Sequence, residues 1–216
     1  MELLPHDIEQ YVNAHTSQES VILKALDRET HQKILHPRML SGHLQGRVLS
    51  MLSHMIKPKN ILEIGTYTGY SALCFAEGLQ NGGRIDTIDK NEELAHMVKK
   101  YVEEAGMQNI IHHHLGLALD IIKTLPHSYD IVFIDADKEN YINYFDAVFD
   151  KVPVGRYIIA DNVLWSGKVL DKKEAEKDRD TRILVAYNKK ITDDPRVENV
   201  LFPIRDGLMI ARKISE

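Results

Sequence analysis

The sequence is poor in cysteine, in long apolar runs and in excess basic charge. It has one cysteine, Cys74, among 216 residues, which excludes an internal disulfide framework and a zinc site built from several cysteines. No run approaches the roughly 18 apolar residues of a membrane-spanning helix. The N-terminus shows neither the basic nor the apolar region of a secretory signal. We therefore expect a cytoplasmic chain that does not use a membrane as partner.

The charge is nearly balanced: 32 acidic and 27 basic residues leave a formal net charge of −5. The basic footprint of a nucleic-acid-binding protein is absent, so nucleic acid is not an expected partner. Hydrophobic residues make up 44% and charged residues 27% of the chain, which is typical of globular proteins. This length favours one domain over residues 1–216, with N-terminal helices over 1–58 and an α/β core over 59–216.

Periodicity divides the chain near residue 58. Before that point the apolar residues recur at helical spacing, and helices are predicted over 7–13, 17–33 and 41–56. After it, short apolar runs alternate with longer amphipathic ones, which is typical of parallel βαβ units. Strands are predicted over 61–64, 84–88, 110–113, 131–134 and 157–160, and helices over 71–79, 92–105, 118–123, 140–149 and 175–191.

Two further strand-like runs, 197–203 and 208–213, flank a turn that contains Asp206-Gly207, a dipeptide typical of hairpins. An antiparallel pair at the edge of a parallel sheet is compatible with both faces being covered by helices. The expected fold class is therefore α/β: a doubly wound, mostly parallel seven-stranded sheet with an antiparallel C-terminal hairpin and an N-terminal helical extension.

A glycine-containing turn follows the first predicted strand. Gly65 permits a tight turn and close approach of a ligand, and Gly69 opens the next helix, whose free N–H groups favour an anion. The spacing is Gly-x-x-x-Gly rather than the Gly-x-Gly-x-x-Gly of dinucleotide sites. Asp89 ends the second strand, where an acid can accept hydrogen bonds from ribose hydroxyls. With Glu63 before it and Asp89 after it, the turn predicts a nucleoside ligand with a carboxylate; an ordinary βα turn is the alternative.

Carboxylates and an amide follow two later strands. Asp135 comes directly after the fourth strand, and Asp161 and Asn162 follow the fifth. If the strands are neighbours, these oxygens converge at one edge of the sheet and suit a hard cation such as Mg²⁺, Mn²⁺ or Ca²⁺. The alternative is that each Asp caps a helix, and Asp137 is as suited to capping as to binding the cation. A lysine or arginine head group in the gap between the three side chains would contradict the cation.

A lysine, a run of histidines and the cysteine each have a structural alternative to a functional role. Lys138 lies three residues past Asp135; it is either a solvated surface lysine or, beside a cation and a desolvated ligand, a general base. The run His112–His114 resembles a metal tract, but alternate side chains of a strand face opposite ways. We therefore interpret these histidines as packing or solvated residues, and Cys74 as an inert core residue.

Three segments together resemble one enzyme family. They read EIGTYTGYS over 63–71, FIDADKENY over 133–141 and DNVLWSGKV over 161–169. The ordered trio is similar to the cation-dependent O-methyltransferases that use S-adenosylmethionine, the family of catechol and caffeoyl-CoA O-methyltransferases and their bacterial relatives. The resemblance implies a Rossmann-like methyltransferase fold, a cytoplasmic homodimer that uses the N-terminal helices as its candidate interface, and a small aromatic hydroxyl compound as acceptor.

The resemblance also implies a role for individual residues. S-adenosylmethionine would be bound by one group, the divalent cation (Mg²⁺ first, with Mn²⁺ or Ca²⁺ as alternatives) by a second, and the acceptor by a third. Catalysis would depend on Lys138 and Asp135. The cofactor group is Glu63, Gly65, Tyr67, Gly69, Ser71, Asp89, Ala118 and Asp135; the metal group is Asp135, Asp161 and Asn162; the substrate group is Met39, Lys138 and Trp165.

The expected activity is divalent-metal-dependent methyl transfer from S-adenosylmethionine to one hydroxyl of a catechol-type acceptor. Two alternatives stay open. One is an S-adenosylmethionine enzyme that methylates a different small molecule. The other is a nucleotide-binding module or dehydrogenase, which the absence of the Gly-x-Gly-x-x-Gly spacing disfavours.

Overall fold

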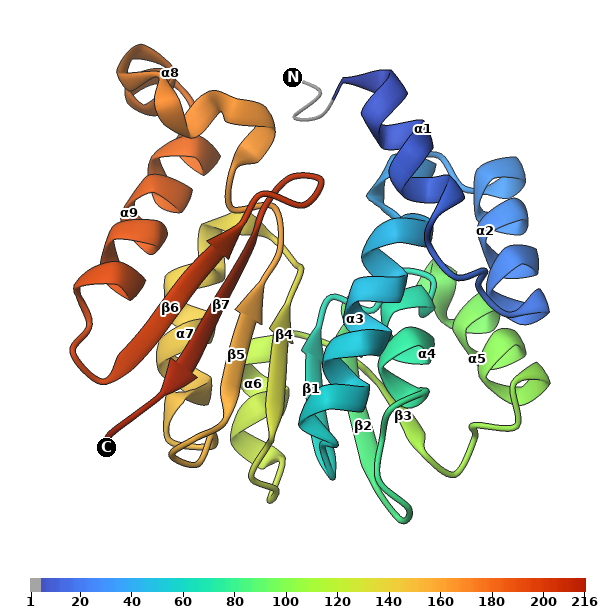
Figure 1. Ribbon diagram of the computed structural model, residues 1–216. Coiled ribbons are helices and arrows are strands. Elements are labelled where there is room, and N and C mark those ends of the chain that lie inside the picture. The colour runs from blue at the N-terminus through green and yellow to red at the C-terminus, as the bar shows by residue number, and fades with distance from the viewer. Residues whose placement is uncertain (1–4) are drawn as a thin grey trace.

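The computed structural model describes residues 5–216; residues 1–4, where the expected N-terminal extension begins, lie outside it. Its centre is a seven-stranded sheet in the order β3-β2-β1-β4-β5-β7-β6 (Figure 1). β1 to β5 pair in parallel, and β7 is antiparallel to both β5 and β6. The strands are β1 (Asn60–Ile64), β2 (Arg84–Asp89), β3 (Ile111–Leu115), β4 (Ile131–Ile134), β5 (Tyr157–Ala160), β6 (Val197–Phe202) and β7 (Leu208–Lys213).

Helices cover both faces of this sheet (Figure 1). One apolar cluster joins the sheet to α2, α3, α4 and α5, and the other joins it to α6, α7 and α9. The doubly wound α/β fold with its C-terminal hairpin is confirmed. The helices are α1 (His6–Ala14), α2 (Val21–Lys33), α3 (Gly42–Ile56), α4 (Tyr70–Ala76), α5 (Ala95–Glu104), α6 (Ala118–Thr124), α7 (Tyr141–Phe149), α8 (Lys172–Lys177) and α9 (Arg179–Asp193).

The central strand β4 explains why its sequence is apolar throughout. Ile131 and Phe133 pack into the cluster on the α4 side, whereas Val132 and Ile134 pack into the cluster on the α7 side. Successive side chains of a strand face opposite ways, so a strand covered on both faces has no position for a polar residue. Because β4 runs parallel to β1 and β5, its carboxyl end, and with it Asp135, lies at the edge where these strands also end.

The predicted helix over 175–191 is wrong in its first part. The chain forms α8, breaks at Asp178 and restarts as α9. Asp178 has an extended backbone, and its carboxylate accepts a hydrogen bond from the N–H of Thr181 at 3.3 Å. A side-chain acceptor at this position starts a new helix because it satisfies an N–H group that the first turn leaves free.

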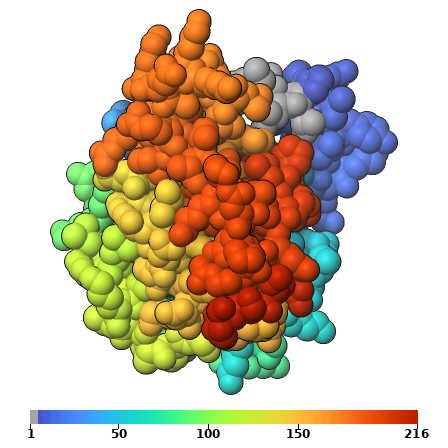
Figure 2. All heavy atoms as spheres, turned by 90° about the vertical axis from the view of Figure 1, so that its left-hand side faces the viewer, coloured from blue at the N-terminus to red at the C-terminus, as the bar shows by residue number. Residues whose placement is uncertain are grey.

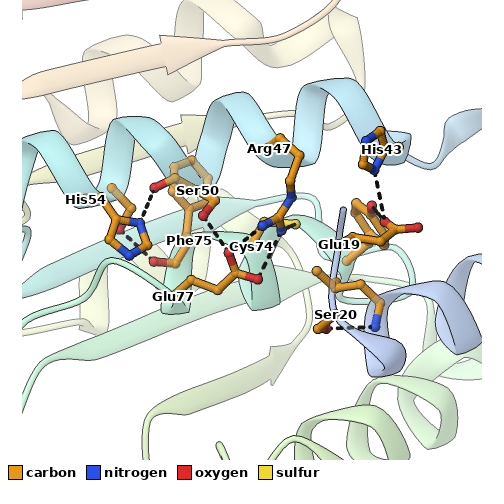
Figure 3. A network of polar contacts seen from close by, with 12 residues as sticks. Glu19, Ser20, His43, Arg47, Ser50, His54, Cys74, Phe75 and Glu77 are labelled. Carbon is orange, nitrogen blue, oxygen red and sulfur yellow. Dashed lines mark hydrogen bonds and ion pairs between the residues drawn. The ribbon is translucent and has the colours of Figure 1, made fainter. Parts of the chain in front are cut away.

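The N-terminal helices are attached to α4 through a polar network (Figure 3). Arg47 of α3 forms a bidentate pair with Glu77, at 2.8 and 3.0 Å, and Ser50 donates to the same carboxylate. Cys74 lies in this network, fully buried, and burial raises the pKa of its thiol even though Arg47 lies beside it. The expected inert role of Cys74 agrees with this environment.

The C-terminal elements form one side of the molecule. Figure 2 shows α9 and the β6–β7 hairpin over this face, with α8 projecting at the same end as α1. That end is also where the parallel strands have their carboxyl ends (Figure 1). Within residues 5–216, no helix combines the length and apolar character needed to cross a membrane.

Candidate active site

A cavity of about 1900 Å³ opens at the carboxyl ends of the parallel strands. It spans both sides of the point between β1 and β4 where the strand order reverses, the usual ligand position in open α/β sheets. Most of the residues expected from the sequence line it. They are Met39, Gly65, Tyr67, Asp89, Ala118, Asp135, Lys138, Asp161, Asn162 and Trp165.

The turn after β1 touches the end of β4. Gly65 has φ +102°, and a Cβ at this position would overlap the carbonyl oxygen of Asp135. Only glycine has both the conformational freedom and the missing side chain that this approach requires. The turn and Asp135 are therefore held in direct contact, which places the turn predicted to bind a nucleoside next to the acidic group.

Asp89 connects the end of β2 to the same turn. One carboxylate oxygen accepts the backbone N–H of Tyr67 at 2.8 Å, and the other accepts that of Asn91 at 2.9 Å. The Tyr67 hydroxyl in turn donates to the carbonyl of His36 at 3.0 Å. Asp89 thus orders the turn and still faces the cavity, as a ribose-binding acid must.

Glu63, Gly69 and Ser71 do not line the main cavity. Glu63 is completely buried and accepts hydrogen bonds from the hydroxyls of Ser71, at 2.5 Å, and Thr87. Ser71 lines a small adjoining pocket together with Gly65. Direct contact of these residues with a cofactor stays a prediction, since the structure places Glu63 beneath the turn rather than on its surface.

Burial raises the pKa of Glu63 to about 8, and the hydroxyls of Ser71 and Thr87 offset only part of this rise. The unfolded chain ionises Glu63 near its ordinary value of 4.5. Between about pH 4.5 and 8 the unfolded chain has released the Glu63 proton, whereas the folded protein still holds it. The free energy of unfolding should therefore fall as the pH rises through this range. We expect the unfolding temperature of Glu63→Gln, relative to the wild type, to increase between pH 5 and 8 in thermal melts without metal. A difference that is independent of pH would contradict this.

The ends of β4 and β5 bring the predicted acidic group together. These strands are neighbours in the sheet, so Asp135 and Asp161 follow adjacent strand ends. Asn162 adopts φ +60°, a left-handed conformation that asparagine tolerates better than most residues. The environment of Asp161 changes its acidity. Burial, and then the negative charge of Asp135, raise the pKa of Asp161 to about 7.

Lys138 lies within this group rather than in solvent. Its Nζ is 2.8 Å from Asn162 Oδ1 and 3.5 Å from Asp135 Oδ1, and its side chain is 8% exposed. It also donates to the Tyr141 hydroxyl at 2.6 Å and to the carbonyl of Ala136 at 3.1 Å. The solvated alternative for Lys138 is therefore wrong, and its ammonium occupies part of the space that the sequence assigned to a cation.

Asp161 is oriented by two other groups. Its Oδ1 accepts the backbone N–H of Asn162 at 2.7 Å, and its Oδ2 accepts the side-chain amide of Gln45 at 2.6 Å. Asp137, the competing candidate, instead accepts the hydroxyl of Tyr144 at 2.7 Å, and its side chain caps no helix. In the part of the chain that the structure describes, no three His, Cys, Asp or Glu side chains are arranged to hold a metal; the group above has two carboxylates and an amide.

Met39 and Trp165, the residues predicted to contact the acceptor, both line the cavity. Met39 is 58% exposed in the cavity wall. The indole N–H of Trp165 donates to Asp178 at 3.3 Å, the residue that starts α9. Lys138 Nζ is 5.8 Å from the centre of the Trp165 ring, so the lysine faces the wall where an aromatic acceptor would stack.

The histidine tract has the structural role expected of it. His114 pairs with the buried Asp86 at 2.7 Å, and burial lowers the pKa of both His112 and His113. None of the three lines the cavity.

Sequence reasoning missed the residues that support the predicted ones. Gln45 and Tyr141 contact Asp161 and Lys138, and Asp178 contacts Trp165. A polar residue on the apolar face of a helix was the available signal for Gln45, because it shares that face with Leu49, four residues later. No local pattern pointed to Tyr141 or Asp178.

Comparison with known proteins agrees with this geometry. Residues 13–214 match the family model described as O-methyltransferase. Caffeoyl-CoA O-methyltransferase 2 of Eucalyptus globulus is 38% identical over 79% of this chain and 73% of its own. The O-methyltransferase from Bacillus cereus, solved in complex with SAH, has a TM-score of 0.88 at 29% identity, covering 96% of this chain and 97% of its own. The O-methyltransferase TomG from Streptomyces achromogenes, solved in complex with SAM, has a TM-score of 0.87 at 26% identity, covering 97% of this chain and 96% of its own. The chain therefore belongs to the O-methyltransferase family.

Proposed function

We propose that this protein transfers a methyl group from S-adenosylmethionine to one hydroxyl of a catechol-type acceptor, with a divalent cation bound by Asp135, Asp161 and Asn162. The observation that carries the proposal is the convergence of these three side chains and Lys138 on the wall of the same cavity that Gly65 and Asp89 line. The relatives solved with SAH and SAM support the cofactor. Residues 1–216 are proposed to form a single catalytic domain.

The donor set fits a hard cation such as Mg²⁺. Two neighbouring acids share the nearby positive charge of Lys138, and the pKa of Asp161 is raised in spite of it. A divalent ion would supply further positive charge between them. Lys138 fills only part of the gap between the three side chains: its Nζ contacts Asn162 and Asp135 but makes no hydrogen bond or ion pair with Asp161. The amide and carboxylate oxygens each have more than one lone pair and can bind a cation beside the ammonium. If Lys138 gives up its contacts with Asp135 and Asn162, it keeps those with Tyr141 and Ala136.

The residues of the chain then have separate tasks. A bound cation would stabilise the phenolate and orient both hydroxyls of the acceptor. In its neutral amine form, Lys138 is placed to accept the proton of the reacting hydroxyl and so become the ammonium, and Tyr141 holds its Nζ at the cavity wall. Trp165 and Met39 position the aromatic ring, while the turn at Gly65 and Asp89 holds the methyl donor. Positioning of the two substrates supplies most of the rate enhancement.

The test is methylation of a simple catechol, followed by mass spectrometry of the product. We expect a singly methylated product with Mg²⁺ or Mn²⁺, and loss of activity in EDTA that added metal restores. The matched monophenol should be a poor acceptor because it cannot chelate. Full activity in the metal-free preparation would contradict the metal role. No product from the catechol, together with methylation of an acceptor that carries an amine or a carboxylate, would favour the alternative acceptor class.

A homodimer through the N-terminal helices is also part of the proposal. It is supported by the exposed apolar side chains of Met51 and Met55 on α3, which are 61% and 73% exposed.

A further inference from the structure

A glutamine of the N-terminal helices reaches the proposed metal site. Gln45 of α3 is 1% exposed, and its amide donates to Asp161 Oδ2 at 2.6 Å. Asp161 is itself 2% exposed. No donor among residues 5–216 reaches the other end of this amide, the buried Oε1. A buried polar atom that makes no hydrogen bond lowers the stability of the fold. An amide with only one of its two ends hydrogen-bonded therefore needs an explanation beyond packing.

The position of Gln45 is set by close packing around it. A Cβ on the next residue, Gly46, would lie 2.7 Å from the Tyr70 ring and 2.9 Å from the sulfur of Cys74. Helix α3 therefore approaches α4 more closely than any larger residue would allow. At the start of α3, Arg205 of the β6–β7 loop donates to the carbonyls of Leu40, at 2.8 Å, and Ser41. Both contacts restrict the movement of α3 relative to the sheet.

We propose that Gln45 is a positioning residue for the Asp161 carboxylate, a role that rests on the proposed metal-dependent function. Its amide holds Oδ2 in one orientation and carries no charge, so it orients the ligand without competing with a cation. The unpartnered Oε1 leaves one acceptor free, which a water molecule in the site would satisfy. Groups of this kind around metal ligands typically affect metal affinity about 10- to 100-fold.

A purely structural role of Gln45 would give a different experimental result. If Gln45 only filled space, its replacement would lower the stability of the fold and leave cation affinity unchanged. Ser53 offers the matched control, because it lies on the same helix, is fully buried and loses one hydrogen bond, to the carbonyl of Phe75 at 2.6 Å, on substitution by alanine. That contact lies away from the cavity lining.

The experiment measures Mn²⁺ binding by electron paramagnetic resonance and S-adenosylhomocysteine binding by calorimetry in the same full-length preparations. For Gln45→Met, which keeps the length but removes the amide, we expect Mn²⁺ affinity to fall about tenfold or more and S-adenosylhomocysteine affinity to stay within about twofold of the wild type. The side chain of Gln45→Asn is one methylene shorter, so its amide should not reach Asp161, and we expect the same loss of Mn²⁺ affinity. This variant replaces Gln45→Met if Gln45→Met does not fold. Ser53→Ala should lower the unfolding temperature only.

The outcomes separate the two proposals. Wild-type Mn²⁺ affinity in either folded Gln45 variant overturns the positioning role and leaves the proposed function intact. A wild-type protein that binds S-adenosylhomocysteine but no Mn²⁺ overturns the metal dependence, and the role of Gln45 with it. An equal loss of Mn²⁺ affinity in Ser53→Ala shows a general effect of α3 and also overturns the specific role.

Discussion

Asp161→Asn is expected to abolish methyl transfer while making the metal-free protein more stable. The substitution keeps the shape of the side chain but removes one of two acids from the proposed cation site. Loss of one of the two negative charges that hold the cation removes several kcal/mol of transition-state stabilisation, which corresponds to about 10²-fold or more in rate. Activity should therefore fall to near background even with millimolar Mg²⁺, whereas S-adenosylhomocysteine should still bind.

The gain in stability follows from the sign of the pKa shift. Burial and the charge of Asp135 raise the pKa of Asp161 from 3.8 to about 7. Above pH 7 the acid is ionised in the folded and unfolded states, and the folded state carries the unfavourable charge. A neutral asparagine removes that charge, so the unfolding temperature at pH 8 in EDTA should rise by a few degrees; one kcal/mol corresponds to about 2–4 °C at this size.

Asp137→Asn is the matched control for this experiment. Asp137 lies in the loop after β4, two residues from Asp135, but hydrogen bonds from Tyr144 and Asn140 outweigh its burial and hold its pKa below the ordinary value. Its charged form is therefore stabilised by the fold, and the substitution should lower the unfolding temperature at pH 8. If both variants changed stability in the same direction, the unfavourable environment inferred for Asp161 would be wrong.

Lys138→Met is expected to lower kcat by about 10²- to 10⁴-fold, the range typical of a lost general base. The thioether side chain fills the volume of the lysine stem. The shape of the cavity wall and the proposed stacking of the aromatic acceptor on Trp165 should therefore be kept. KM for the acceptor should change little, because the cation and the ring contacts remain. Steady-state kinetics with a saturating methyl donor measure both parameters.

A second buried lysine provides the control. Lys213 is 1% exposed and donates to the carbonyl of Phe149 at 3.3 Å, on a strand that does not line the cavity. Lys213→Met should reduce stability and leave kcat within about twofold. A comparable loss of kcat in both variants would assign the effect of Lys138 to the fold rather than to proton transfer.

The order of the strands and helices was readable from the sequence because it depends on local periodicity. The apolar run of β4 predicted a strand covered on both faces, and the position of Asp135 just after it followed from the boundary of that run. The break at Asp178 was missed, although it is a local feature. Charged residues at helical spacing continue across it, and only the backbone conformation distinguishes a helix start from an interior position.

By itself, the sequence determined which residues end each parallel strand, and therefore which chemical groups could face one edge of the sheet. Tertiary structure decided which of them meet. The pairing of β4 with β5 brings Asp135 to Asp161, and the packing of α3 on α4 brings Gln45 to the same carboxylate across 116 positions of the chain. Lys138 joined this group rather than solvent because Tyr141, Ala136 and Asn162 surround its amine. Periodicity can show that a residue such as Gln45 is buried, but not which side chain it contacts, because that depends on close packing between distant segments.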